Sequence, residues 1–570
     1  MTLNESKKLN RTAALLLAVV LNAAFFLFIL GGFELRFETN DDLLMSKFVD
    51  GQLSHKSAHV PFINIGLGAL FKLLYMLGGD SIPWWSICEY AAAFLGFTAV
   101  TWIFLRRFRP FPALTITTVI LCVFALDTYL SMNFSKASAA ASVGGLSLML
   151  HAMRNDEKRV LKLPLVLGFL LSVYGFMWRF EEFFACAAII AGLGVYALIE
   201  IGQEKRGAAL REKLMPMLRY AAPFVLLLVT VVALFGVNHL AWTNSEYKDY
   251  YTFDWTRSEL IDSVVPEYSQ MPEVYDSLDM DENAIKLFKG WSFYDTEKFT
   301  TESLRAVIDA RSEFVHFPGL GECLSKFIEE CIPGFYQERP LPGLLFMLIL
   351  FFACGRRGLK EWVTALWLAG VFAGMYFVFI YFDRYLVNRI DIGLFFALAV
   401  GFAWLLDTER LKGEKLLCAV VIAAVLFVGY RSARSVCRFD SHNTIEDKSD
   451  EKAAVETILD DNEHLYFVKY LSIDHELYAP FELPPQGYAD KIVFIGGWSC
   501  RHPEIVRVLD AWGITNPYRD IIGSESIRII DNDIETTMAY INKYYAPSAA
   551  AERVEPLSTQ TGLNIYRILD

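Results

Sequence analysis

The 570-residue chain lacks the features that mark several common protein classes. It has no basic excess, because 52 Lys and Arg stand against 65 Asp and Glu and give a net charge of −13. A nucleic-acid-binding protein would show a basic face, so nucleic acid is excluded as a partner. No Cys-x-x-Cys pair or His/Cys metal-ligand spacing occurs. The C-terminal part also has no phosphate-binding loop and no nucleophile elbow.

The nine cysteines are spread singly along the chain. Five lie in apolar runs, where we expect inert packing residues: Cys88, Cys122, Cys186, Cys354 and Cys418. The other four lie in polar segments. Cys323 with Cys331, and Cys437 with Cys500, would form disulfides only if those segments face an oxidising compartment. The sequence leaves both pairings open.

Long apolar runs are abundant, since 54% of the residues are hydrophobic and 45 are Phe. Several runs approach the roughly 20 residues needed to cross a bilayer. We therefore predict an α-helical multi-pass membrane protein with about eleven spans. The first run has no cleavage site and should be an uncleaved helix. The expected spans are 12–33, 84–105, 111–130, 136–153, 161–178, 182–200, 217–237, 341–354, 361–381, 390–406 and 415–431.

Basic residues gather in alternate connections between these runs. By the positive-inside rule this pattern predicts an N-terminus inside and a C-terminus outside. The inner set is Lys7, Lys8, Arg11, Arg106, Arg107, Arg109, Arg154, Lys158, Arg159, Lys162, Lys205, Arg206, Arg211, Lys213, Arg219, Arg356, Arg357, Lys360, Arg410, Lys412 and Lys415. The outer segments are then a first loop at 34–83, a large loop at 238–340 and the C-terminal part. The apolar run 62–77 would belong to the first loop, on or partly in the outer leaflet.

The two larger outer segments differ in character. The loop at 238–340 is rich in aromatic and acidic residues, which suits interfacial helices with an aromatic belt, or surfaces on which sugars stack. The C-terminal part, 434–570, predicts an extracytoplasmic α/β domain that follows a transmembrane domain at 1–433. It would be a lid, an acceptor-recognition module or a purely structural unit. Its expected strands are 465–471, 491–497, 526–531 and 562–569, and its expected helices are 449–460, 502–513 and 533–545.

The first outer loop predicts a short amphipathic helix that lies on the membrane surface and contains an anomalous acid. Asn40 is the expected N-cap and Gly51 the expected stop. The helical period aligns Asp41 with Leu44, Met45 and Phe48, whereas it aligns Asp42 with Ser46 and Asp50. A carboxylate on an apolar side is costly unless it faces a polar cavity. Asp41 is therefore the leading catalytic candidate, with Asp42 beside it.

Charged residues also gather at the expected outer ends of the spans. Each one alone would be a snorkelling side chain or a structural ion pair. Together they suggest an outward-facing polar cavity at the membrane border. In that cavity Asp41 and Asp127 would supply carboxylates, and four cations would hold a phosphate: Lys136, Arg179, Arg384 and Arg389.

Two histidines follow the acidic helix in the stretch HKSAHVPF. The spacing of His55 and His59 fits two metal ligands on one helical face, but Pro61 and the serines favour a loop. Hydrogen bonding near a substrate, or plain surface packing, are the other readings.

This arrangement resembles the GT-C-type glycosyltransferases, the polyprenyl-phosphate-sugar-dependent enzymes that include protein mannosyltransferases and lipid A aminoarabinose transferases. The resemblance rests on the Asp41–Asp42 pair in the first outer loop, the His-x-Pro at 59–61, and the expected topology. It implies that Asp41 is the catalytic carboxylate, that Asp127 lies near it, and that a sugar passes with inversion to an envelope glycan, lipid or protein. The active site would lie on the extracytoplasmic face of the plasma membrane.

Three alternatives stay open. A polysaccharide polymerase or ligase would share a large outer loop but usually depends on arginines in it. A lipid-linked-sugar transporter or flippase would show polar or broken mid-span helices and paired repeats. A non-catalytic scaffold is the third. The sequence does not decide whether a divalent cation takes part.

Overall fold

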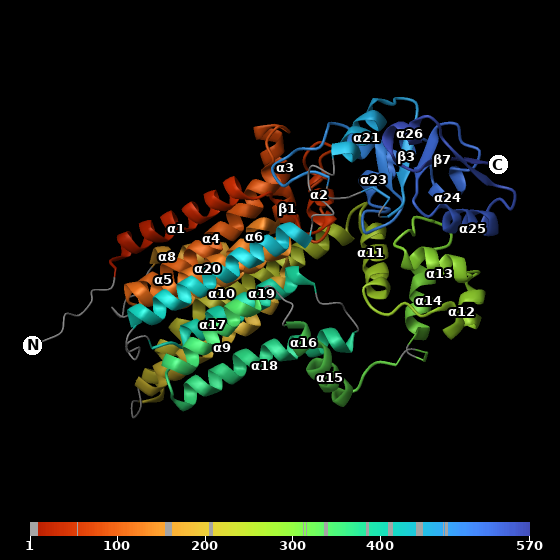
Figure 1. Cartoon of the computed structure of the whole chain (residues 1–570). Coiled ribbons are helices and arrows are strands. Elements are labelled where there is room, and N and C mark those ends of the chain that lie inside the picture. Colours follow the sequence, from red (N-terminus) through yellow and green to blue (C-terminus); the bar gives the residue numbers. More distant parts are fainter. Residues whose placement is uncertain are drawn as a thin grey trace, which may run out of the picture.

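The computed structural model describes residues 9–53, 55–153, 162–204, 209–311, 313–314, 316–335, 340–382, 387–407, 414–439, 449–470, 472–473 and 477–570. Long helices form a bundle (Figure 1). One end of the bundle carries an α/β unit and a group of short helices, drawn in blue and green.

Each of the eleven expected spans is helical. The helices are α1 (Arg11–Gly32), α4 (Trp84–Arg107), α5 (Pro110–Val119) continued by η1 (Ile120–Ala125) and α6 (Leu126–Leu130), α7 (Phe134–Met153), α8 (Lys162–Trp178), α9 (Phe180–Glu204), α10 (Leu210–Thr243), α17 (Leu341–Cys354), α18 (Leu359–Tyr381), α19 (Asn388–Trp404) and α20 (Glu414–Phe439). Among the described residues, six helices are long and apolar enough to cross a membrane: α1, α4, Pro110–Leu130, α9, α10 and α18. The others are shorter or less apolar, so the number of crossings stays a prediction.

Helix α7 is the centre of the bundle and packs against α4, α8, α9 and α19. Its sequence is rich in Ala, Ser and Gly, and it is buried along almost its whole length. Small residues allow the backbones to approach closely. A Cβ on Gly96 of α4 would lie 2.1 Å from the Ala140 carbonyl oxygen of α7, so this crossing requires glycine.

The base-rich connections meet at the end of the bundle away from the α/β unit. Arg106 donates to the Leu9 carbonyl at 2.6 Å, and Arg107 donates to the Trp404 carbonyl at 2.6 Å. Lys360 at the start of α18 forms a 2.6 Å ion pair with Glu200 near the end of α9. The base-rich connections between these helices therefore lie together at one end of the bundle, as the charge pattern predicted. Which end faces the cytoplasm stays a prediction.

The first loop lies at the opposite end of the bundle. Strand β1 (Arg36–Phe37) pairs in parallel with β2 (Ser131–Met132), and α2 (Asn40–Ser46) follows. The N-cap is Thr39 rather than Asn40, and the helix ends at Ser46, before the expected stop at Gly51. Residues 55–64 form a loop, and α3 (Ile65–Gly78) covers most of the apolar run at 62–77.

The expectation of a surface helix was wrong. Asp42, Ser46 and Asp50 are buried, although the pattern assigned them to the polar face. The reason is that the C-terminal part covers this loop. Gln52 donates to the Pro484 carbonyl at 3.0 Å and accepts from the Tyr488 amide at 3.2 Å.

The segment 238–340 forms α11 (Lys248–Ile261), η2 (Tyr268–Gln270), α12 (Pro272–Ser277), α13 (Glu282–Lys289), α14 (Thr301–Arg311), α15 (Leu320–Lys326), η3 (Phe327–Cys331) and α16 (Ile332–Phe335). The central part of this segment packs on the C-terminal unit, and the aromatic belt stays a prediction. Fully buried Asp295 accepts hydrogen bonds from Tyr540 at 2.7 Å and from Tyr545 at 2.6 Å.

The C-terminal unit is a five-stranded sheet in the order β4-β3-β5-β7-β6. Its strands are β3 (Leu465–Val468), β4 (Ile492–Phe494), β5 (Ile527–Ile530), β6 (Ala550–Arg553) and β7 (Ile565–Leu569). Its helices are α21 (Ser449–Asp460), α22 (Tyr488–Lys491), α23 (Pro503–Ala511), α24 (Pro517–Asp520), α25 (Ile534–Tyr544) and α26 (Leu557–Thr561). The first three strands run parallel and the last two antiparallel. All four predicted strands and all three predicted helices are present.

The edge strand β6 was missed, because its sequence AAER has no buried alternation. Cys323, Cys331 and Cys500 are free thiols in the described part of the chain, so the Cys323–Cys331 disulfide does not form. The side chain of Cys437 lies outside the described residues.

Candidate functional site

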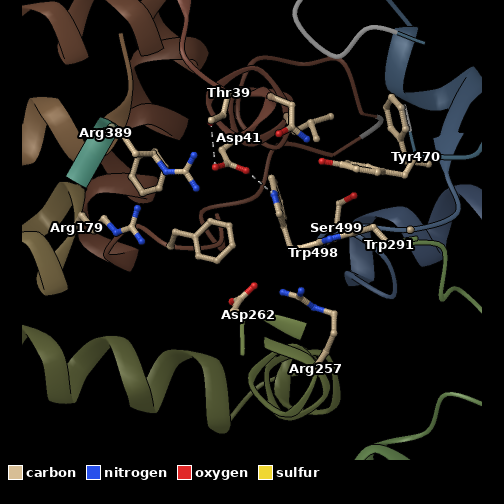
Figure 2. Close-up of a pocket in the computed structure, with 17 residues that line it drawn as sticks. Thr39, Asp41, Arg179, Arg257, Asp262, Trp291, Arg389, Tyr470, Trp498 and Ser499 are labelled. Atoms are coloured by element: carbon tan, nitrogen blue, oxygen red, sulfur yellow. Dashed lines mark hydrogen bonds between the residues drawn. The ribbon is translucent and has the colours of Figure 1, made fainter. Parts of the chain in front are cut away.

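A cavity of about 280 Å³ lies where the bundle, the first loop, α11 and the C-terminal unit meet (Figure 2). Segments far apart in the sequence line it. The lining residues are Thr39, Asn40, Asp41, Leu44, Phe62, Phe134, Arg179, Arg257, Asp262, Trp291, Arg389, Tyr470, Phe494, Gly496, Gly497, Trp498 and Ser499. Asp41, Arg179 and Arg389 belong to the set that the sequence predicted.

Asp41 reaches the cavity from the first turn of α2 and is held by two donors. The Thr39 hydroxyl donates to Oδ2 at 3.1 Å, and the indole N–H of Trp498 donates to Oδ1 at 3.0 Å. Figure 2 shows both contacts and the carboxylate turned toward the open space. Leu44, one helical turn on, lines the same cavity. A carboxylate oriented in this way could accept a proton from a bound ligand.

Asp42 points the other way and is fully buried. Its carboxylate accepts from the Asn133 amide at 2.9 Å and from the Phe134 backbone N–H at 3.1 Å. Burial, and then repulsion from Asp41, raises the pKa of Asp42 to about 8. Asp42 does not line the cavity, so it has no direct access to a ligand there. The helical phase therefore placed the two acids on different sides of the helix, as the structure does. The side that carries Asp42 faces the protein interior, although its polar pattern predicted exposure.

Two arginines enter the cavity from the bundle side, Arg179 between α8 and α9 and Arg389 at the start of α19. Arg179 donates to the Ser135 hydroxyl at 2.5 Å and lies 5.0 Å from the ring centroid of Phe134. Among the described residues, Arg179 forms an ion pair with Glu181 at 3.8 Å. Because this long ion pair neutralises the charge of Arg179 only weakly, the guanidinium suits an anionic ligand. Arg384 lies outside the described residues.

Asp127 and Lys136 form a buried cluster away from the cavity lining. Lys136 lies 2.5 Å from both Asp127 Oδ1 and Glu38 Oε2, and it also donates to the Ser131 carbonyl at 2.7 Å. Asn388 donates to Asp127 at 3.1 Å. Lys136 is thus paired with two carboxylates, so the cluster fits a structural role that ties the first loop to α6, α7 and α19.

The histidines are also away from the cavity lining. His55 is exposed. His59 stacks on Tyr247 with ring centroids 3.8 Å apart, and its Nε2 lies 3.2 Å from the Ala241 carbonyl. His59 therefore packs the first loop against the end of α10. In the described part of the chain, no three His, Cys, Asp or Glu side chains gather in a way that could hold a metal.

Sequence reasoning missed the part of the site that comes from the outer segments. Arg257, Asp262 and Trp291 come from the large loop, and Tyr470, Trp498 and Ser499 come from the C-terminal unit. Two signals pointed toward them. The large loop is rich in aromatic residues, and Trp498 and Ser499 directly follow the predicted strand at 491–497, where loops often carry function.

No protein-family model and no curated protein sequence matches this chain. Among solved structures, the chain is similar to ArnT from Cupriavidus metallidurans bound to undecaprenyl phosphate, with 12% identity and a TM-score of 0.41 over 97% of each chain. It is also similar to the apo state of that protein, with 11% identity and a TM-score of 0.39 over 97% of this chain and 98% of the other. We therefore infer the function from the residues of the cavity and not from this likeness.

Proposed function

We propose that the protein is a membrane glycosyltransferase that moves a sugar from a polyprenyl-phosphate donor to an envelope acceptor. The observation that carries the proposal is the meeting of Asp41, Arg179 and Arg389 in one cavity at the end of an apolar bundle. A lipid-phosphate donor needs all three features: a base, cations for the phosphate, and helices against which its tail can lie.

The chemistry follows from these positions. Asp41 takes the proton from the acceptor hydroxyl as the acceptor oxygen bonds to the anomeric carbon. The bond between that carbon and the phosphate oxygen breaks, and its electron pair stays on the leaving lipid phosphate. Arg179 and Arg389 stabilise the charge that develops there. Because attack and departure occur on opposite faces of the carbon, one displacement inverts the anomeric configuration.

The proposal includes an orientation. With the base-rich end in the cytoplasm, the cavity, the large loop and the C-terminal unit lie on the outer face of the plasma membrane. Single cysteines introduced near Asp281 and near Glu451 should then react with an impermeant thiol reagent in intact cells, and one near Arg357 should not. Labelling of the Arg357 position together with the Glu451 position would contradict this topology.

The central experiment offers the purified protein two donors that carry the same labelled sugar. One is polyprenyl-phosphate-linked and the other is nucleotide-linked, and the readout is loss of the labelled sugar from each donor. We expect turnover of the lipid-linked donor only. Replacement of Arg179 or Arg389 by Ala should raise the KM for the lipid donor at least about tenfold, since a charge-assisted hydrogen bond contributes about 1.5–3 kcal/mol. Turnover of the nucleotide-linked donor instead would reject the proposal.

A further inference from the structure

The cavity has a second half that the proposed chemistry does not use. Arg179, Arg389 and Asp41 lie on one side of Trp498, and Trp291, Tyr470 and Arg257 lie on the other sides (Figure 2). The first group comes from the bundle and the first loop. The second comes from the large loop and the C-terminal unit, so the two halves are built by different parts of the chain.

Trp291 is fixed in this second half by its backbone. Its φ is +57°, a left-handed conformation that bulky residues rarely adopt and that concentrates at functional sites. The Gly497 N–H donates to the Trp291 carbonyl at 3.0 Å. A Cβ on Gly496 would lie 1.7 Å from that same oxygen, so only glycine permits the approach.

The side chain of Trp291 forms an aromatic platform with Tyr470. Their ring centroids are 5.9 Å apart and their planes differ by 28°. Both residues line the cavity and both are partly exposed. A flat, half-covered aromatic surface in a polar cavity suits the apolar face of a sugar ring better than it suits a phosphate.

Arg257 provides a hydrogen-bond donor beside this platform. The side chain is 2% exposed, and its Nε and Nη2 donate to Asp254 at 3.0 and 2.5 Å. Its Nη1 is buried without a hydrogen-bond partner among the described residues. Because Asp254 already balances the charge, and exposed Asp262 lies nearby, this half of the cavity suits a neutral hydroxyl better than an anion.

We propose that this half is a subsite for a neutral saccharide acceptor, whose ring stacks on Trp291 and whose hydroxyl accepts from Arg257 Nη1. The inference rests on the proposed glycosyltransferase function and deepens it by naming the acceptor as a glycan rather than a protein or a lipid. A ring placed here would approach Asp41 from the side opposite the two phosphate-binding arginines, as an inverting displacement requires.

The test measures binding and catalysis separately. Neutral trisaccharides of glucose, mannose and galactose, a uronic-acid trisaccharide and a Ser/Thr-containing peptide are titrated against the full-length protein, with ligand-observed NMR as readout. Trp291→Ala should weaken neutral-trisaccharide binding about tenfold or more, whereas Trp291→Tyr should restore most of it. Trp255→Ala, an exposed tryptophan of α11 that does not line the cavity, is the matched control and should bind as the wild type does.

Donor cleavage with water as the acceptor separates this inference from the function on which it rests. The wild type should show that cleavage, and so should Trp255→Ala, because Trp255 does not line the cavity. Preferred binding of the uronic trisaccharide or the peptide, no saccharide binding by the wild type, or saccharide binding unchanged in Trp291→Ala would each overturn the saccharide subsite. None of these results would bear on donor cleavage, whose absence from the wild type would instead reject the proposed function.

Discussion

Two clusters of charge lie at the same end of the bundle, and each combines acidic with basic side chains. In the buried cluster, Lys136 is held between Asp127 and Glu38, with side-chain exposures of 0%, 2% and 15%. In the open cluster, Asp41 faces a cavity that it shares with Arg179 and Arg389. The difference is that the buried lysine is already paired with two carboxylates, whereas the open groups retain capacity for a ligand. Charge at the predicted outer ends of the spans therefore identifies both clusters. Only their arrangement in space shows which cluster is open to a ligand and which one is a buried structural contact.

The largest effect should come from removing the carboxylate of the open cluster. Asp41→Asn keeps the size of the side chain but removes its basicity, so sugar transfer should fall about 10²–10⁴-fold. Thermal stability should stay near that of the wild type, because Asp41 is partly exposed. Asp127→Asn is the matched change in the buried cluster and should show the reverse pattern, with lowered stability. Full transfer by Asp41→Asn would end the proposed mechanism.

The next contrast concerns the cations. Lys136→Met leaves Asp127 and Glu38 without their shared partner, and removing one member of a buried ion pair costs about 3–5 kcal/mol. We expect a large loss of thermal stability, measured by unfolding in detergent. Arg389→Met should instead leave the unfolding temperature nearly unchanged and raise the KM for the donor. If the Lys136→Met protein were as stable as the wild type but had lost donor binding, Lys136 would be a donor-binding residue and not a structural one.

The two neighbouring acids allow a test by pH. The folded-state pKa of Asp42 is raised from 3.8 to about 8, so between those pH values the folded protein holds a proton that the unfolded chain releases. Stability from this group is therefore present at low pH and is lost as the pH rises toward about 8, by on the order of a few kcal/mol.

Asp42→Asn should remove this dependence, and its unfolding temperature should fall less between pH 5 and pH 8 than that of the wild type. Asp249→Asn, an exposed acid of α11, should follow the wild-type curve. An Asp42→Asn curve that superimposes on the wild-type curve would show that Asp42 is ionised in the folded protein.

Much of this arrangement could be predicted from the sequence, because it depends on local pattern. Runs of about 20 apolar residues predicted helices, and short runs rich in β-branched and aromatic residues located β3, β4, β5 and β7. The separation of Asp41 from Asp42 followed from helical phase alone.

The rest depends on contacts between distant segments, which no local pattern encodes. Trp498 and Asp41 are 457 residues apart and meet only when the C-terminal unit covers the first loop. The same covering buries Asp42 and Ser46, which local amphipathicity assigned to the surface. Lys136 and Arg179 were equivalent candidates in the sequence. In the folded protein Lys136 is paired with Asp127 and Glu38, whereas Arg179 lines the cavity.

The smallest expected effect tests that covering contact directly. Trp498 is 6% exposed, and its ring packs against Phe62 at 5.3 Å and Phe48 at 6.2 Å between centroids. Trp498→Phe keeps most of this packing but removes the indole N–H that holds Asp41. A single hydrogen bond contributes about 1 kcal/mol net, so we expect kcat to fall roughly fivefold while the KM for the donor changes little.

The comparison variant is Trp512→Phe, a partly buried tryptophan of the same unit that does not line the cavity. It should keep the wild-type kcat. If Trp498→Phe lowered the stability but left kcat unchanged, the hydrogen bond from Trp498 to Asp41 would hold the C-terminal unit on the first loop without orienting Asp41 for catalysis. If kcat fell as expected at unchanged stability and unchanged donor KM, the C-terminal unit would contribute to the open cluster by orienting Asp41 through the indole N–H of Trp498.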